Sequence, residues 1–312
     1  MSPLPVPDTV LDEAIWRTLA YAGLFQYPLR LEELCQRLMD VEAGEARVAD
    51  RLAAAPLRGR LALRDGFFMP AGCEEWADLR RTRAQRTDQL LADHRRALAV
   101  VAHFPFVRLA ALSGACAHGN ATDDDVDVFL VTRRGRPWMV TLLLMIASKL
   151  AGLRRSLCVN YVVSEEGLAL PEHDRFTAAE ITALRPLAGR ETYRRFIGAN
   201  PWAAAYQPNF FAAYGRDPSR VPERAGSPRL EALLNAVGGD RLETLARRVL
   251  EPYLRRRLPG AGVDLSDRRL KLHGHDHRPV VSRAFSSEVE IEGELQGVGG
   301  VSSPAPPGAS RR

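Results

Sequence analysis

The fold of this chain is decided by residues 112–131, which read LSGACAHGNATDDDVDVFLV. The segment holds a glycine-containing turn, then an acidic run, then an apolar run that is typical of a buried strand. Side chains two residues apart in a strand project to the same face. We therefore expect Asp125 and Asp127 to share one face, opposite to the valines that flank Asp127.

Two carboxylates at the start of a buried strand need a compensating charge, because burying an unpaired charge is costly. A hard divalent cation such as Mg²⁺ or Mn²⁺ takes carboxylate oxygens as ligands and commonly bridges to the phosphates of a nucleotide. We therefore predict that Asp125 and Asp127 are metal ligands. The simpler alternative is an acidic turn before the strand, since Asp123 and Asp124 extend the acidic run.

The composition is that of a globular protein. The chain has 312 residues, of which 46% are hydrophobic, enough for one large or up to three ordinary domains. The formal net charge of +5 comes mostly from arginine. This excess suits a polyanionic ligand, although a similar excess often serves only solubility.

The spacing of the cysteines and the length of the apolar runs bear on the cellular compartment of the protein. The four cysteines lie far apart without a Cys-x-x-Cys pair, which argues against a structural zinc site or a disulfide framework: Cys35, Cys73, Cys116 and Cys158. The N-terminus does not resemble a secretory signal, and the longest apolar run, 138–147, is too short to cross a bilayer. The sequence therefore predicts a cytoplasmic protein with reduced cysteines and no membrane partner.

Residues 1–72 are predicted to form a winged-helix-like unit. Apolar periodicity favours three helices, and Asp65-Gly66 between short apolar runs is a strong hairpin signal. The expected elements are helices over 8–22, 31–39 and 44–54 and a hairpin over 61–69.

Residues 73–170 are predicted to form an α+β core, a small mixed sheet with flanking helices. A long arginine-rich helix leads into it, and one helix opens with proline in its first turn. The expected elements are a helix over 74–103, paired strands over 106–112 and 126–132, a helix over 137–150 and a strand over 157–164.

The remaining chain is predicted to be a helical region over 171–285 and a disordered tail over 286–312. The tail is rich in Gly, Ser, Pro and Arg from residue 297 onward. The expected helices cover 177–184, 191–198, 229–237 and 240–257.

The glycine and carboxylate pattern resembles the nucleotidyltransferase superfamily with the DNA polymerase beta-like palm fold. In that family a glycine pair or Gly-Ser follows the first strand and an Asp-x-Asp opens the second, as do Gly114 and Asp125 to Asp127 here. The chain also resembles bacterial nucleotidyltransferase-domain proteins in which a winged-helix-like unit precedes the catalytic domain. The phrases that carry this narrower resemblance are LAYAGLFQYPL at 19–29, CVNY at 158–161 and NPW at 200–202, and the resemblance covers roughly residues 10–285.

The resemblance implies a metal-dependent enzyme that moves a nucleoside monophosphate from a nucleoside triphosphate to a hydroxyl acceptor. ATP is the expected donor, and the acceptor is a small molecule, a protein or RNA. The resemblance implies that Asp125 and Asp127 bind the metal ion. It also implies that Ser113, Gly114 and Ala115 form the turn that contacts the phosphates.

The site departs from the family pattern at two positions. Ala115 stands where the family usually has serine or glycine, so a hydroxyl for the phosphates is missing. Asn160 is the best candidate for the position of the third catalytic carboxylate, and an amide can bind a cation but cannot act as a base.

Other charged groups are candidates for a role in the site. Arginines within 80–96, or Arg133 and Arg134, are candidates for holding the triphosphate, although a solvated helix face is the simpler interpretation of the first group. Glu180 is interpreted as a helix-surface acid, with a site role as the alternative. The histidines of the segment HGHDH are interpreted as a polar loop ahead of a metal site: His273, His275 and His277.

Two other functions remain open at the sequence level. Ala115 and Asn160 favour a catalytically inactive palm-fold protein that binds nucleotide or acts as a regulatory module. The winged-helix-like unit makes a DNA-binding regulator the third hypothesis. DNA is not the favoured partner, because the basic residues of segment 44–54 are balanced by acidic ones in and around it.

Overall fold

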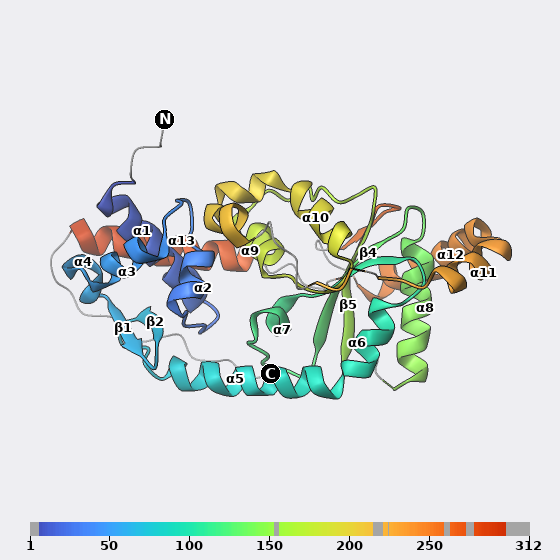
Figure 1. Ribbon diagram of the computed structural model, residues 1–312, viewed down its shortest axis with the longest axis horizontal. Coiled ribbons are helices and arrows are strands. Elements are labelled where there is room, and N and C mark those ends of the chain that lie inside the picture. Colours follow the sequence, from blue (N-terminus) through green and yellow to red (C-terminus); the bar gives the residue numbers. More distant parts are fainter. Residues whose placement is uncertain are drawn as a thin grey trace.

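The computed structural model of this chain describes residues 6–152, 156–214, 221–223, 225–258, 263–272 and 278–297. It is an α+β protein with a six-stranded mixed sheet and a small two-stranded sheet. Figure 1 shows an elongated molecule, with the N-terminal helices and the small sheet at one end and the large sheet toward the other.

The N-terminal unit, residues 8–70, has the helices and hairpin that the sequence predicts. Its core packs apolar residues of the first helix, Leu11, Ile15 and Leu19, against Leu34 and Val48. One short helix, α4, was not predicted. The elements are α1 (Asp8–Gly23), α2 (Leu31–Gln36), α3 (Glu45–Ala53), α4 (Ala55–Arg58), β1 (Leu61–Arg64) and β2 (Phe67–Pro70).

The hairpin turn forms where the sequence predicts it. Asp65 and Gly66 both have positive φ, 54° and 79°, as a tight two-residue turn between twisted strands requires. Leu29 pairs with Phe68 on the other side of β2. The hairpin is therefore tied to the segment between α1 and α2.

The long arginine-rich helix is broken, contrary to the prediction of one helix over 74–103. It consists of α5 (Trp76–Asp93) and α6 (Arg95–Ala102), separated at His94, whose ψ is 5°. The ring Nδ1 of His94 and its backbone amide both bond to the Leu90 carbonyl oxygen, at 2.8 and 3.0 Å. In Figure 1, α5 runs along one side of the molecule and α6 turns toward the sheet.

The large sheet has the strand order β6-β3-β4-β5-β8-β7. β4 pairs antiparallel with β3 and parallel with β5, and α8 makes the crossover between β4 and β5. The three strands of the predicted core are confirmed. The elements are β3 (Val107–Leu112), α7 (Gly114–His118), β4 (Val126–Thr132), α8 (Pro137–Leu150), β5 (Leu157–Ser164), β6 (Arg185–Ala188), β7 (Asp264–Leu265) and β8 (Arg269–Lys271).

The region predicted as helical over 171–285 also supplies strands, which the sequence analysis did not predict. β6 extends the sheet beside β3, and β8 extends it beside β5. Such short edge strands carry no alternating pattern of their own, so their pairing depends on the strand they meet. The helices of this region are α9 (Arg175–Ala183), α10 (Arg190–Gly198), η1 (Pro201–Ala205), η2 (Phe210–Tyr214), α11 (Pro228–Ala236) and α12 (Gly239–Arg257).

Helices cover both faces of the sheet. Val126, Val128 and Leu130 of β4 join one core with residues of α6, α8 and α12. Phe129 and Val131 join the other core, with residues of α9 and α10. The predicted alternation along β4 is confirmed, and Asp127 therefore lies on the α9 side of the sheet.

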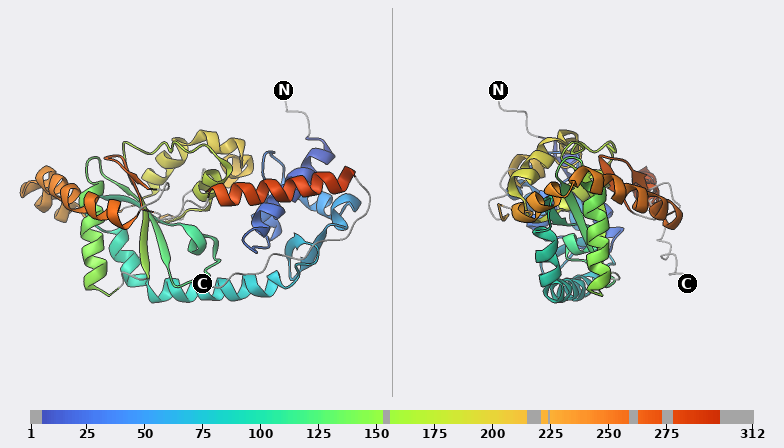
Figure 2. Two further views of the ribbon diagram at one scale, coloured as in Figure 1. Left: turned by 180° about the vertical axis from the view of Figure 1, so that it is seen from behind. Right: turned by 90° about the vertical axis from the view of Figure 1, so that its right-hand side faces the viewer.

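The last described helix, α13 (Arg278–Gly297), returns from the sheet to the N-terminal unit, as Figure 2 shows. It packs against α1 and α9. The Phe285 ring contacts the Tyr21 ring with centroids 5.5 Å apart. The helix covers 286–297, where the sequence predicted a disordered tail, because its first turns have a packing surface that no local pattern reveals. Residues 298–312 lie outside the described residues.

Within the part of the chain that the structure describes, we find no helix with the length and apolar character needed to cross a membrane.

Candidate active site

The turn after β3 touches the carboxylate of Asp127. Gly114 has φ of 58°, in the left-handed region, and a Cβ added there would lie 2.5 Å from Oδ2 of Asp127. Only glycine fits this position, since any other side chain would displace the carboxylate. The Ser113 amide donates to the Asp127 carbonyl oxygen at 3.0 Å, which holds the turn beside the start of β4.

Asn160 lies on the neighbouring strand and contacts the same carboxylate. Its Nδ2 donates a hydrogen bond to Oδ1 of Asp127. In the β4–β5 register, Val128 pairs with Val159 and Phe129 pairs with Tyr161, so Asn160 is the extra residue of a β-bulge. A bulge redirects side chains locally. The bulge accounts for an asparagine that reaches an acidic side chain from within a strand.

Burial controls the charge of Asp127. It raises the pKa of this carboxyl from 3.8 to about 6. The hydrogen bond from Asn160 acts in the opposite direction, and the charges of Asp125 and Asp123 raise the pKa further. Asp127 is therefore a buried acid for which a cation would be a favourable partner.

Asp125 directly precedes β4, and the prediction that it shares a face with Asp127 stays a prediction. Its backbone amide donates to Oδ1 of Asp123 at 3.2 Å. Its pKa is raised by partial burial and by the neighbouring charges of Asp123 and Asp124. The charge of Asp125 raises the pKa of Asp127, but Asp125 does not line the cavity that opens beside Asp127, described next.

A cavity of about 1310 Å³ opens beside Asp127, between the N-terminal unit and the sheet. It brings together most of the site residues predicted from the sequence. Those that line it are Ser113, Gly114, Ala115, Asp127 and Asn160. The volume exceeds that of typical small-molecule sites, about 300–1000 Å³.

Glu180 on α9 is a site residue that the sequence led us to interpret as a surface acid. It lines the same cavity, and the Gly114 backbone amide hydrogen-bonds to it. Burial raises its pKa to about 7, and the charge of Asp127 raises it in the same direction. Its side chain is 37% exposed, and this exposure faces the cavity. The sequence feature that could have indicated a site role for Glu180 is a single charged residue among mostly apolar ones, in the run TAAEI at 177–181.

His118, which the sequence analysis gave no role, completes this side of the cavity. Arg37 of the N-terminal unit bonds to its Nδ1 at 2.8 Å, and its Nε2 lies 4.0 Å from Oε1 of Glu180. Burial and the charges of Arg37 and Arg80 lower its pKa to about 3. The imidazole is therefore neutral, and because Nδ1 accepts from Arg37, Nε2 carries the proton.

Of the arginines predicted to hold a triphosphate, Arg83 lines the cavity and bonds there to the Phe25 carbonyl oxygen and to Asn120. Two others are engaged away from the cavity wall. Arg80 donates to Gly119 and Tyr27 and pairs with Glu33, and Arg86 pairs with Asp124 at 2.7 Å. Arg133 and Arg134 follow the far end of β4, about 20 Å from Asp127 at the strand rise per residue.

The cavity is also lined by Lys271 of β8 and Arg278 of α13, as well as by Arg37 and Arg60 of the N-terminal unit. Lys271 and Arg278 pair with Glu172 at 3.3 and 3.6 Å, and Arg278 lies 3.8 Å from Asp174. Lys271 and Arg278 escaped the sequence analysis because β8 and α13 were not predicted.

The predicted metal ligands do not form a closed metal cage. Among the described residues, no cluster of three or more His, Cys, Asp or Glu side chains could hold a metal ion. His273, His275 and His277 lie outside the described residues.

No protein-family model, curated protein or solved structure matches this chain.

Proposed function

We propose that this chain is a metal-dependent nucleotidyltransferase that moves a nucleoside monophosphate from a nucleoside triphosphate, ATP as the expected donor, to a hydroxyl acceptor. One observation carries the proposal: the Gly114 turn lies against the Asp127 carboxylate, inside a cavity large enough for a nucleotide. Glycine lets backbone amides approach phosphate oxygens, and the carboxylate next to it suits a phosphate-bound cation.

The donor set fits Mg²⁺ or Mn²⁺. Mg²⁺ is usually held by one or two carboxylates together with water and substrate phosphates. Asp127, with the charge of Asp125 in reach, supplies such a set, and the raised pKa of Asp127 reflects a buried carboxylate without a cation. When bound, the metal would stabilise charge on the transferring phosphate and on pyrophosphate.

The residues of the chain would position the reactants. Asn160 holds one oxygen of Asp127 and so orients the other toward the Gly114 turn. Lys271 pairs with Glu172, and Arg278 pairs with Glu172 and Asp174; both cations line the cavity and could contact the triphosphate by exchanging these partners. Positioning and charge neutralisation are the main contributions that such a reaction requires.

The topology supports the finer fold proposal, a polymerase beta-like palm preceded by a winged-helix-like unit. β3 and β4 are antiparallel, β4 and β5 are parallel, and the acidic residue stands at the start of β4. The N-terminal unit combines three main helices with a hairpin.

A nucleotide-binding protein without transferase activity is the second candidate. It is favoured by the amide of Asn160, which bonds to Asp127 where the resemblance implies a carboxylate. Ala115, which lines the cavity without a hydroxyl, points the same way.

The structure gives little support to DNA binding by the N-terminal unit. Arg51 of α3 pairs with Asp8 and Asp12 of α1 at 2.9 and 2.5 Å, and Arg47 also pairs with Asp8. The exposed side chains on and next to α3 include Glu42, Glu45 and Asp50. A surface of this charge repels phosphates.

Calorimetric titration of Mg-ATP tests the proposal. The Asp125→Ala/Asp127→Ala double variant is expected to bind at least tenfold more weakly than the natural chain, and Asp88→Ala, an exposed acid of α5, is the control. Equal affinities for the double variant and the natural chain would contradict the site. Transfer of label from ATP labelled at the α-phosphate, abolished in Asp127→Asn, would then separate the transferase from the binding protein.

A further inference from the structure

The cavity extends beyond the proposed nucleotide site to the N-terminal unit. Its wall on that side comes from the second half of α1 and the segment after it, including Ala20, Tyr21 and Ala22. The part of this wall on α1 is mainly apolar, and three arginines also line this side: Arg37, Arg60 and Arg83. Glu180 and the neutral His118 face it from the core. The cavity thus has a phosphate-binding side at the sheet and a second, mixed apolar and polar side.

Two side chains that carry hydrogen-bonding groups line this second side. Tyr21 lines the cavity within electrostatic reach of Glu180, and burial together with the Glu180 charge raises the pKa of Tyr21, so the phenol stays protonated. Within the described part of the chain, burial and nearby charges, and no side-chain hydrogen bond, account for the raised pKa of the Tyr21 phenol. Glu180 accepts from the Gly114 amide, which ties it to the phosphate turn.

The N-terminal unit is fixed in place around this second side. Asn209 bonds to the backbone of Ala43 and Cys35, and Tyr27 donates to the His118 carbonyl oxygen at 2.6 Å. α13 packs across both α1 and α9. The two walls are therefore held together by several independent contacts, and a folded macromolecule would have to separate them to reach Glu180.

A nucleic acid would require an open basic track, and the described cations that line the cavity are instead engaged with protein groups. Arg60 lies over the Trp16 ring. Arg37 bonds to His118, and Arg83 bonds to Phe25 and Asn120. Lys271 and Arg278 pair with Glu172. Small and aromatic residues of α1 beside a protonated phenol and a carboxylate suit a compact hydroxyl compound.

We propose that the acceptor is a small-molecule alcohol held between Tyr21 of the N-terminal unit and Glu180 of α9. This inference rests on the proposed nucleotidyltransferase function and assigns its acceptor side. Tyr21 would donate to a polar group of the alcohol, and Glu180 would accept the hydrogen bond of the reacting hydroxyl. The proposal gives the N-terminal unit a role in acceptor recognition.

In the transfer, the acceptor oxygen forms a bond to the α-phosphorus of the nucleoside triphosphate. The bond from that phosphorus to the bridging oxygen of the β-phosphate breaks, and pyrophosphate leaves with the electron pair. The proton of the acceptor hydroxyl moves to the Glu180 carboxylate. The products are the nucleotidylated alcohol and pyrophosphate, so neither an oxidant nor a further reactant is needed.

The test combines binding and transfer on the full chain. Cell extract is split by filtration at about 1 kDa, and each fraction is incubated with the protein, Mg²⁺ and ATP labelled at the α-phosphate. We expect a labelled product only with the small-molecule filtrate. Glu180→Gln should slow its formation about 100-fold, and Tyr21→Phe about tenfold. Both variants should bind Mg-ATP within twofold of the natural chain.

Glu191→Gln, which changes an acid of α10 with 71% side-chain exposure, is the matched control and should transfer at the natural rate. Label only in the retained protein or RNA would overturn the small-molecule acceptor, as would natural rates in both Tyr21→Phe and Glu180→Gln. Binding of Mg-ATP without transfer to either fraction would overturn it too. A natural chain that does not bind Mg-ATP would instead refute the proposed function on which the inference rests.

Discussion

Gly114 is the residue at which backbone conformation and candidate chemistry meet. Its positive φ turns the chain after β3, and its missing Cβ leaves room for the Asp127 carboxylate. Gly135 also has positive φ, 63°, but open space surrounds the position of its absent Cβ. Substitutions at the two glycines therefore distinguish the free-energy cost of backbone strain, which both share, from the cost of a steric clash, which only Gly114 would have.

Gly114→Ala should lower the free energy of unfolding by about 2–4 kcal/mol, because it adds a clash with Asp127 to the backbone strain. Gly135→Ala should cost about 1–2 kcal/mol from strain alone. Urea unfolding of the two variants measures the difference. Equal losses would mean that the carboxylate moves aside freely, contrary to a constrained site.

Asp127→Asn should stabilise the metal-free protein at neutral pH. The folded pKa of Asp127, about 6, lies above the ordinary value of 3.8, so the ionised form opposes folding. This cost is absent below pH 3.8, grows as the pH rises to 6 and is complete above it. The gain should be on the order of 2 kcal/mol at pH 7.5 and near zero at pH 4. Thermal unfolding in EDTA checks it, and a gain independent of pH would contradict the burial of this charge.

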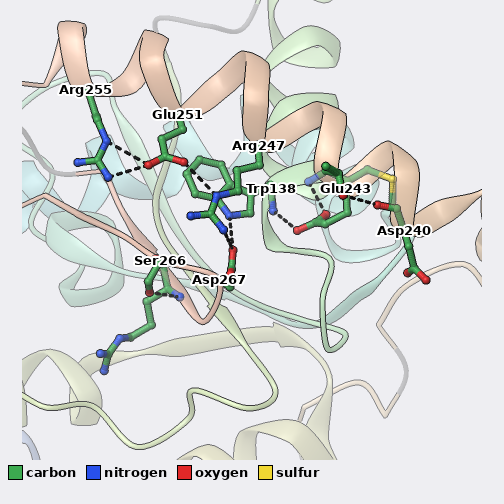
Figure 3. Close-up of polar contacts among 11 residues, drawn as sticks. Trp138, Asp240, Glu243, Arg247, Glu251, Arg255, Ser266 and Asp267 are labelled. Carbon is green, nitrogen blue, oxygen red and sulfur yellow. Dashed lines mark hydrogen bonds and ion pairs between the residues drawn. The ribbon is translucent and has the colours of Figure 1, made fainter.

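At the scale of elements, α12 fixes the start of α8, the helix that joins β4 to β5. Glu243 of α12 accepts from the backbone amides of Trp138 and Met139, at 3.0 and 2.8 Å. Figure 3 shows Glu243 beside Trp138. Pro137 at the first helical position has no amide hydrogen, so Glu243 satisfies the next two free amides of this turn. Close by, Asp267 accepts from the Trp138 indole and from Arg247 (Figure 3).

Glu243→Ala should therefore lower the free energy of unfolding by about 1–2 kcal/mol, as the loss of a helix cap usually does. Glu251→Ala, which removes pairs with Arg247 and Arg255 along the same helix, is the control and should cost less than about 0.5 kcal/mol. Thermal unfolding of both variants gives the comparison. A larger loss in the control would show that α12 is held by its surface ion pairs.

At the scale of the whole molecule, the N-terminal unit and the core are joined by buried polar contacts. The Asn209 side chain, 7% exposed, donates to the carbonyl oxygens of Cys35 and Ala43 and accepts from the Ala43 amide. Arg175 of α9 pairs with Asp40 at 3.0 Å. These contacts set the width of the cavity between the two parts.

Asn209→Ala should lower the free energy of unfolding by about 2–3 kcal/mol, because it leaves buried backbone groups without partners. Gln89→Ala on the exposed face of α5, where the side chain bonds only to Asp93, is the control and should stay within about 0.5 kcal/mol. Urea unfolding measures both. If Asn209→Ala is as stable as its control, the polar contacts do not hold the N-terminal unit against the core.

The sequence by itself determined the features that depend on neighbouring residues. The hairpin at Asp65-Gly66 follows from the positive φ that this turn demands, and the alternation along β4 follows from the pleat of a strand. The nearness of Gly114 to Asp127 follows from the short connection between two paired strands. Each of these is encoded within about twenty residues, so a local pattern suffices.

Only the tertiary structure decided which distant groups share the cavity. Glu180 and Tyr21 come from helices far apart in the sequence, and each reads locally as an ordinary helical residue. The same holds for the strands β6 and β8, which acquire their pairing from the sheet edge they meet. Their positions depend on how packed layers orient whole elements, and spacing along the chain carries no record of that orientation.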